Sequence, residues 1–155
     1  MKLSKNLSLS EVTKSNTATR KGISNNPTHE HLDNLVRLAA NIFQPIRDNF
    51  KTSIGISSGY RSKELNNIIG GSSYSQHCKG EALDLDADIY GGCTNAEIFN
   101  FIKDNLVFDQ LIWEFGTDEN PNWVHVSYSD KDDNRMMILR ADKVKGRTRY
   151  TRIDG

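Results

Sequence analysis

The segment ALDLDAD, residues 82–88, alternates apolar and acidic side chains, and it constrains the fold more than any other feature of the chain. A period of two is typical of a β-strand whose two faces differ in exposure, so we predict a strand over 82–88. The segments QLIWEF (110–115) and WVHVSY (123–128) are two further predicted strands, and the short polar loop 116–122 joins them. Because parallel strands need a longer crossover, this loop favours an antiparallel pair.

The remaining elements are three helices and two strands, and a helix comes first among them. Asn26-Pro27 is typical of a helix start, and apolar residues follow it at helical spacing until Pro45 is expected to kink the helix. Four further elements are predicted: a strand over 52–57, a short helix over 63–69, a helix opened by the capping box Thr94–Glu97, and a last strand over 135–139.

This order of elements predicts an α+β fold in which a mostly antiparallel sheet packs against helices. The chain of 155 residues fits one domain with a core of ordinary size. Residues 1–25 are polar and lack a sustained period, so we expect an extended or loosely packed lead-in there. Residues 26–155 are then expected to form the single domain.

The charge balance limits the classes of partner. Lys+Arg and Asp+Glu both total 20, which argues against a nucleic-acid-binding protein because phosphate backbones are bound by clustered positive charge. No apolar run reaches the about 18 residues of a membrane span, and no secretory signal is visible, so we expect the protein to stay in the cytoplasm unless lysis releases it to the cell wall. We also expect it to be a monomer. The tail 143–152 carries five cations and is predicted to be a solvated terminal strand or arm; weak attraction to an anionic polymer is the alternative.

The predicted strands bring together side chains that are suited to hold a metal. Alternation places Asp84 on one face of its strand, and Gly80 allows the chain to turn so that His77 converges with that carboxylate. His125 lies in the middle of 123–128; taken alone, such a histidine is more often a hydrogen-bonded core residue. Two histidines and one carboxylate are nevertheless a common donor set for catalytic zinc, which activates water and polarises a carbonyl oxygen.

Two further residues have the chemistry that such a centre would need. A carboxylate that is not a ligand is required as general base, and Glu114 in the neighbouring strand is the best-placed candidate; otherwise it is a strand carboxylate that faces solvent. Arg61, at a tight turn after a predicted strand, offers a planar fork for a carboxylate or a developing oxyanion. Its alternative interpretation is an exposed surface arginine.

Three ordered motifs carry a resemblance to a known family. They are SxHxxGxAxD, matched in full by Ser75, His77, Gly80, Ala82 and Asp84, an upstream SGYRS (58–62) and a downstream WVHVS (123–127). Together they resemble the zinc D-alanyl-D-alanine carboxypeptidase family of peptidoglycan peptidases, whose relatives include vancomycin-resistance dipeptidases, phage endolysins and the Hedgehog signalling domain. The similarity spans roughly residues 5–130.

The resemblance implies the roles of five residues. His77, Asp84 and His125 would be the zinc ligands. Arg61 would match the family's substrate-binding arginine, and Ser75 would form a hydrogen bond near the substrate terminus.

One position departs from the family pattern. Several relatives carry the catalytic acid three residues before the second histidine, and Asn122 stands there in this chain. Because an amide cannot take a proton from water, we assign the general base to Glu114, with the loop residues Asp118 and Glu119 as substitutes.

The sequence therefore predicts a zinc metallopeptidase that hydrolyses peptidoglycan stem peptides at or near D-alanine. One alternative is a phage or prophage endolysin that cuts cross-links and reaches the cell wall by lysis. Another is a catalytically inactive, zinc-containing module that binds the cell wall, which the departure at Asn122 keeps open. A structural domain without metal would require all three motifs to be coincidental.

Overall fold

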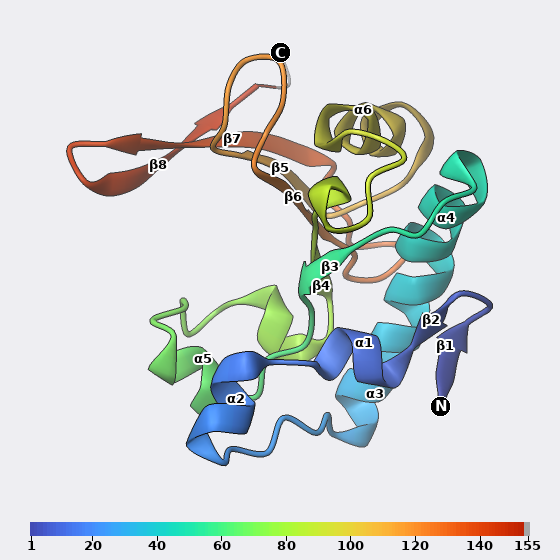
Figure 1. The fold of residues 1–155 in the computed structure, drawn as a ribbon, viewed down its shortest axis with the longest axis vertical. Coiled ribbons are helices and arrows are strands. Elements are labelled where there is room, and N and C mark those ends of the chain that lie inside the picture. Colours follow the sequence, from blue (N-terminus) through green and yellow to red (C-terminus); the bar gives the residue numbers. More distant parts are fainter. Residues whose placement is uncertain (154–155) are drawn as a thin grey trace.

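A single mixed sheet organises the protein in the computed structural model, which describes residues 1–153 (Figure 1). Its strands, in spatial order, are β3 (Ile56–Ser58), β4 (Ala82–Leu85), β6 (Trp123–Ser127), β5 (Gln110–Glu114), β7 (Met137–Val144) and β8 (Arg147–Arg152). All neighbours pair antiparallel except β5 and β7, which are parallel. The predicted α+β fold with a mostly antiparallel sheet is confirmed.

Four of the helices are α3 (His29–Leu38), α4 (Gln44–Phe50), α5 (Lys63–Ile68) and α6 (Asn95–Asn105). Helices α3, α4 and α6 share one apolar core with the sheet. Helix α3 begins two residues later than Asn26-Pro27 predicts, because Thr28 accepts the capping hydrogen bond from the backbone N–H of His31. Pro45 lacks a backbone N–H, and a π-helical turn over Ala39–Phe43 precedes it, so the chain continues as α4.

The sheet has one face in the core and one face that carries polar side chains. Strand register aligns the inward residues in rows across β4, β6 and β5. These residues are Leu83, Val126 and Leu111 in one row and Leu85, Val124 and Trp113 in the next. They pack in one core with apolar residues of α6 and of the α3–α4 region. Fully burying each such side chain stabilises the fold by roughly 1.5–3 kcal/mol, and the polar face is held in place by this packing.

The N-terminal segment differs from the expected loose lead-in. Residues 1–25 form β1 (Lys2–Ser4), β2 (Leu7–Ser8), α1 (Leu9–Thr13) and α2 (Asn16–Lys21). Leu3, Leu7 and Val12 are buried in the main core, and Ser8 and Ser15 cap the two helices. Three isolated apolar residues with two caps are therefore enough to fix a segment that shows no period in its sequence.

Strand lengths also differ from the prediction. The strand expected over 82–88 ends at Leu85, because the side chain of Asp86 accepts a hydrogen bond from the backbone N–H of Asp88 and caps a short 3-10 helix. The strand expected over 52–57 is reduced to β3, whereas the last predicted strand extends to Val144. Asp86 and Asp88 therefore lie outside the strand and do not share the strand face of Asp84.

The basic tail forms the second strand of a hairpin with β7, which projects from the rest of the molecule (Figure 1, red). The prediction of a solvated terminal strand is correct here, since every residue of β8 is exposed. None of the helices within residues 1–153 is long and apolar enough to cross a membrane.

Candidate metal centre

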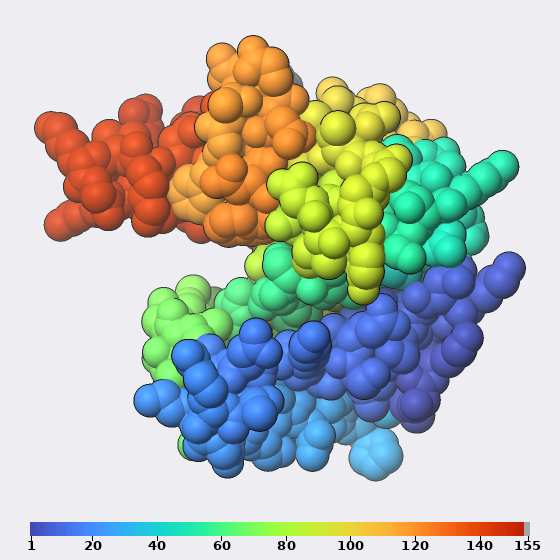
Figure 2. Space-filling model, in the orientation of Figure 1, coloured from blue at the N-terminus to red at the C-terminus, as the bar shows by residue number. Residues whose placement is uncertain are grey.

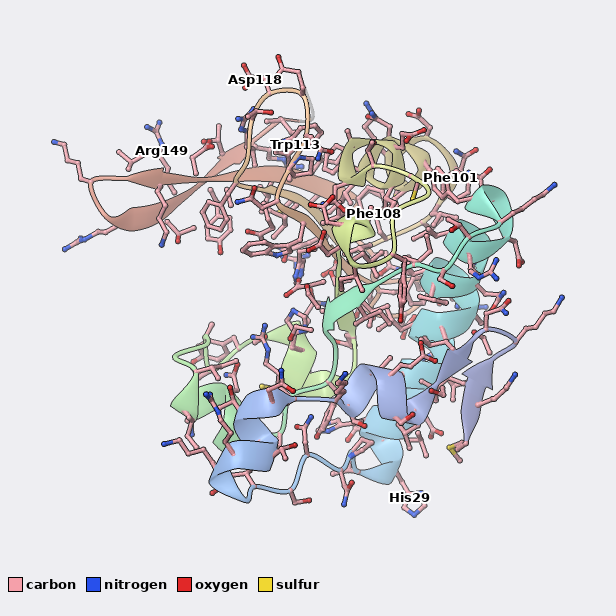
Figure 3. All side chains as sticks on the ribbon, viewed as in Figure 1. His29, Phe101, Phe108, Trp113, Asp118 and Arg149 are labelled. Carbon is pink, nitrogen blue, oxygen red and sulfur yellow. The ribbon has the colours of Figure 1, made fainter. Side chains whose placement is uncertain are left out.

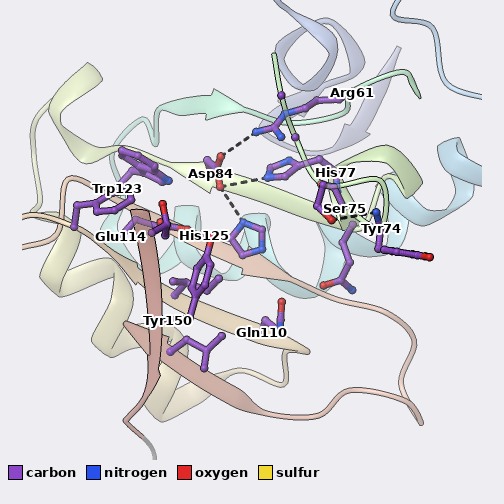
Figure 4. Close-up of a pocket in the computed structure, with 18 of the residues that line it drawn as sticks. Arg61, Tyr74, Ser75, His77, Asp84, Gln110, Glu114, Trp123, His125 and Tyr150 are labelled. Atoms are coloured by element: carbon purple, nitrogen blue, oxygen red, sulfur yellow. Dashed lines mark hydrogen bonds and ion pairs between the residues drawn. The ribbon is translucent and has the colours of Figure 1, made fainter. Parts of the chain in front are cut away.

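His77, Asp84 and His125 meet on the polar face of the sheet (Figure 4). Asp84 of β4 and His125 of β6 are directly opposite in the antiparallel register. His77 lies in a 3-10 helix, Gln76–Lys79, that is capped by the hydroxyl of Ser75. The potential ligand atoms of the three residues all lie within 4.8 Å of one another.

Gly80 makes the return of the chain from His77 to β4 possible. Its φ of 76° lies in the left-handed region that favours glycine. A Cβ built there would lie 2.5 Å from the backbone oxygen of His31, so α3 leaves no room for a side chain. The close approach of this turn to α3 therefore fixes where His77 enters the site.

The hydrogen bonds of His77 leave one ring nitrogen available for a metal. Its Nδ1 lies 2.7 Å from the carbonyl oxygen of Gly59, and a carbonyl can only accept, so Nδ1–H is the donor. The lone pair of Nε2 then faces Asp84, whose Oδ1 lies 3.4 Å away. Metal-binding histidines commonly have this arrangement, because the hydrogen bond of the other ring nitrogen fixes the tautomer and the orientation of the ring.

The electrostatics favour the protonation states that bind metal. Burial alone would raise the pKa of Asp84, but the charges and hydrogen bonds of His77 and His125 outweigh it and hold that pKa well below its usual range. Burial lowers the pKa of His77, although Asp84 opposes the shift. An ionised carboxylate beside a neutral imidazole is the form that coordinates zinc, and the two-nitrogen, one-oxygen donor set fits that ion.

Glu114 lies on the same face as these residues. The β5–β6 register pairs Ile112 with His125 and Glu114 with Trp123, so Glu114 occupies the row next to His125. The residue is only 7% exposed, and burial raises its pKa to about 7, with the charge of His125 opposing the rise and the charge of Asp84 adding to it. A carboxyl group with a pKa near neutrality is suited both to take a proton and to return it.

Arg61 also points into the site rather than to solvent. Its Nη2 lies 3.6 Å from Oδ2 of Asp84, its Nε donates a hydrogen bond to Ser58, and its side chain is 17% exposed. The alternative of an exposed surface arginine therefore does not describe its environment.

The N-terminal segment holds the turn that carries Arg61. The side-chain amide of Asn25 donates to the carbonyl oxygens of Thr13 and Tyr60 and accepts from the backbone N–H of Ser62. At Gly59 a Cβ would lie 2.4 Å from the backbone oxygen of Val12, so the two segments are in close contact. The role of Asn25 cannot be read from the sequence, because its partners are 12 to 37 residues away.

The substitute bases lie elsewhere. Asp118 forms an ion pair with Arg140 in the outer loop, where Figure 3 places it far from the sheet face, and Glu119 is exposed in the same loop. Asn122 is exposed as well, and its backbone N–H donates to the carbonyl oxygen of Glu114. None of these three side chains lines the cavity described next.

A cavity of about 820 Å³ opens over the three potential ligands. Arg61, Ser75 and Glu114 line it together with the loop 70–76, as the sequence predicts for residues of one site. Gln110, Lys143 and Tyr150 line it too and were not identified from the sequence. Alternation along each strand could have grouped Gln110 with Glu114, but Lys143 and Tyr150 reach the cavity only through the pairing of distant strands.

Comparison with known proteins gives one family. The family model described as Peptidase M15 matches residues 5–127, which include His77, Asp84, His125, Glu114 and Arg61. No curated protein matches the sequence at a significant level. The strands β7 and β8 follow the matched range.

Proposed function

This chain belongs to the peptidase M15 family, and on that premise we propose that it is a zinc metallopeptidase that hydrolyses peptidoglycan stem peptides at or near D-alanine. The observation that carries the proposal is the convergence of His77, Asp84 and His125 within 4.8 Å, next to a buried carboxylate in the same cavity. Members of this family are typically zinc dependent, and the donor set suits that ion.

The three residues would hold the zinc ion on the polar face of the sheet. A bound zinc ion would lower the pKa of a coordinated water to about 7 and polarise the scissile carbonyl. Asp84 supplies the negative charge of the ligand set, and its contact with both histidines keeps the three side chains oriented.

Glu114 carries the proton transfers in this proposal. Its carboxylate takes a proton from the attacking water and then gives that proton to the leaving amine. Burial raises the pKa of Glu114 and so makes its carboxylate a stronger base, and a positioned general base typically contributes 10²–10⁴-fold to the rate. Glu114 thereby supplies the function for which Asn122 is unsuited.

Arg61 and Ser75 orient the substrate. The guanidinium of Arg61 provides parallel N–H donors for the oxyanion or for a substrate carboxylate. The hydroxyl oxygen of Ser75 accepts from the backbone N–H of His77, so its own hydrogen remains available to donate to the peptide terminus.

The test is digestion of purified peptidoglycan by the zinc-loaded protein, with the fragments identified by mass. Release of free D-alanine would indicate carboxypeptidase activity, and loss of cross-linked fragments would indicate an endopeptidase. The chelated protein and Glu114→Gln are the controls, which should neither release D-alanine nor reduce the cross-linked fragments. The proposal fails if protein with one zinc per chain leaves the peptidoglycan and its soluble stem peptides unchanged.

A further inference from the structure

The β7–β8 hairpin extends the polar face of the sheet beyond the range that the family model matches. Register pairs Ala141 of β7 with Glu114 on one side and with Tyr150 of β8 on the other. Residues that are paired in register lie on the same face, so Glu114, Ala141 and Tyr150 form one row. Because the side chain of Ala141 is small, the ring of Tyr150 can lean toward the metal centre, as Figure 4 shows.

The hairpin forms one of the two walls of the cavity. Lys143, Thr148 and Tyr150 line it from the hairpin, and the loop 70–76 with Arg61 lines it from the other side. Figure 2 shows this hollow between the red hairpin and the green segment below it. Tyr150 is 57% exposed, which is high for a tyrosine that has a packed sheet beside it. An aromatic ring left open toward a cavity is suited to pack against a bound peptide.

Lys143 gives this wall a positive charge that the described residues leave without a carboxylate partner. Its ammonium donates to the hydroxyl of Thr148 and lies 5.6 Å from the ring centroid of Phe115, and no ion pair joins it to a carboxylate within residues 1–153. Arg135 also lines the cavity, but Asp109 binds it through two oxygens. Lys143 is therefore the cation of this wall that is available to an anionic group.

We propose that the β7–β8 hairpin is a substrate-binding wall, in which Lys143 binds an internal carboxylate of an acidic peptide and Tyr150 packs against the peptide beside the scissile bond. This inference rests on the proposed function, since it places the peptide in the cavity over His77, Asp84 and His125. It assigns the hairpin to recognition of the acidic side chains of the substrate, whereas Arg61 acts at the reacting group.

The same hairpin supplies a matched control. Strand alternation places Lys143 and Tyr150 on the cavity face and Arg147 and Arg149 on the opposite face. Figure 3 shows Arg149 on the side of the hairpin away from the hollow. Lys143→Gln and Arg149→Gln each remove one positive charge from the hairpin, but only the first removes a charge from the cavity.

The experiment measures binding separately from hydrolysis. Zinc-loaded Glu114→Gln protein, which keeps the peptide intact, is titrated into a fluorescein-labelled stem peptide with free internal carboxylates. The same peptide with those carboxylates amidated is the second ligand, and fluorescence anisotropy gives the Kd values. Thermal unfolding of each variant checks that the fold is kept.

In the Glu114→Gln background, Lys143→Gln should weaken binding of the acidic peptide about threefold to fivefold and leave binding of the amidated peptide unchanged. Tyr150→Ala should weaken both peptides about tenfold, and Tyr150→Phe should retain most of the binding because the ring remains. Arg149→Gln should change neither. High salt should reduce the difference between the two peptides.

Two outcomes would overturn the inference. Equal losses in Lys143→Gln and Arg149→Gln would mean general attraction of anions to the hairpin, and no loss in Lys143→Gln or in Tyr150→Ala would mean that the hairpin does not contact the peptide. If the binding pattern is found but the parent protein hydrolyses nothing, the inference holds and the proposed function fails. If the parent protein hydrolyses the peptide but the hairpin variants bind it as tightly as Glu114→Gln alone, the proposed function holds and the inference fails.

Discussion

Replacing Glu114 by glutamine should lower the rate of hydrolysis by about 10²-fold or more and, in the metal-free protein, stabilise the fold at alkaline pH. The carboxyl group is buried in the folded state, and its pKa is raised from 4.5 to about 7. Below pH 4.5 the group is protonated in both the folded and the unfolded states and has no effect on stability. As the pH rises from 4.5 to 7 the unfolded state loses the proton first, so stability falls, and above pH 7 the full penalty is present.

The magnitude follows from the pKa difference. At about 1.4 kcal/mol for each pH unit, a rise from 4.5 to about 7 corresponds to an upper limit of roughly 3–4 kcal/mol. Because glutamine is neutral at every pH, Glu114→Gln should be more stable than the parent protein by up to that amount at pH 8. At pH 4.5 the two proteins should differ little. A bound zinc ion favours an ionised carboxylate nearby, so the gain should shrink in the zinc-loaded protein.

Urea unfolding of the chelated proteins at pH 4.5 and pH 8 measures these differences, and Glu119→Gln in the exposed loop is the control that should show neither. The activity of zinc-loaded Glu114→Gln should fall by about 10²-fold or more while its zinc content is kept. A stability difference that is the same at both pH values would refute the raised pKa of the buried Glu114 carboxyl group. Full activity would refute the assignment of Glu114 as the general base.

Three further predictions address the rest of the site. His77→Ala or His125→Ala should lose stoichiometric zinc after dialysis, because one of three ligands is missing; full metal content by mass spectrometry would refute the ligand assignment. Arg61→Lys should keep its zinc but lower kcat/KM by about tenfold, because an ammonium cannot form the paired hydrogen bonds of a guanidinium; unchanged kinetics would place Arg61 outside catalysis. Asn25→Ala leaves three backbone groups without their partner, so urea unfolding should show a loss of about 2–3 kcal/mol and kcat/KM should fall; parent-like stability would mean that water replaces the amide.

The metal centre could be predicted largely from local patterns. Asp84 and His125 are each placed on one face of a strand by alternation, and the turn at Gly80 brings His77 back toward the same strand. The position of Glu114 could not be predicted from alternation alone. Alternation shows which residues of one strand share a face, but not which of its two faces lies on the same side of the sheet as His125. Only the pairing of Ile112 with His125 decides that question.

The segments that the sequence could not place depend on contacts between distant residues. Leu3, Leu7 and Val12 have no common period, and their burial follows from the core against which they pack. The parallel pairing of β5 with β7 joins residues separated by all of β6, and no turn or period in the sequence records it. Lys143 and Tyr150 reach the cavity through that pairing, which is why they were not identified in advance.

The position of β8 at the edge of the sheet affects how copies of the chain meet in solution. An outermost strand exposes unpaired N–H and C=O groups that can template the addition of another strand and lead to aggregation. Here that strand is RTRYTR, whose cations recur at nearly every second residue. If two copies of the edge met, arginines would face arginines and repel one another. The charge of β8 thus opposes edge-to-edge pairing of two copies through this strand.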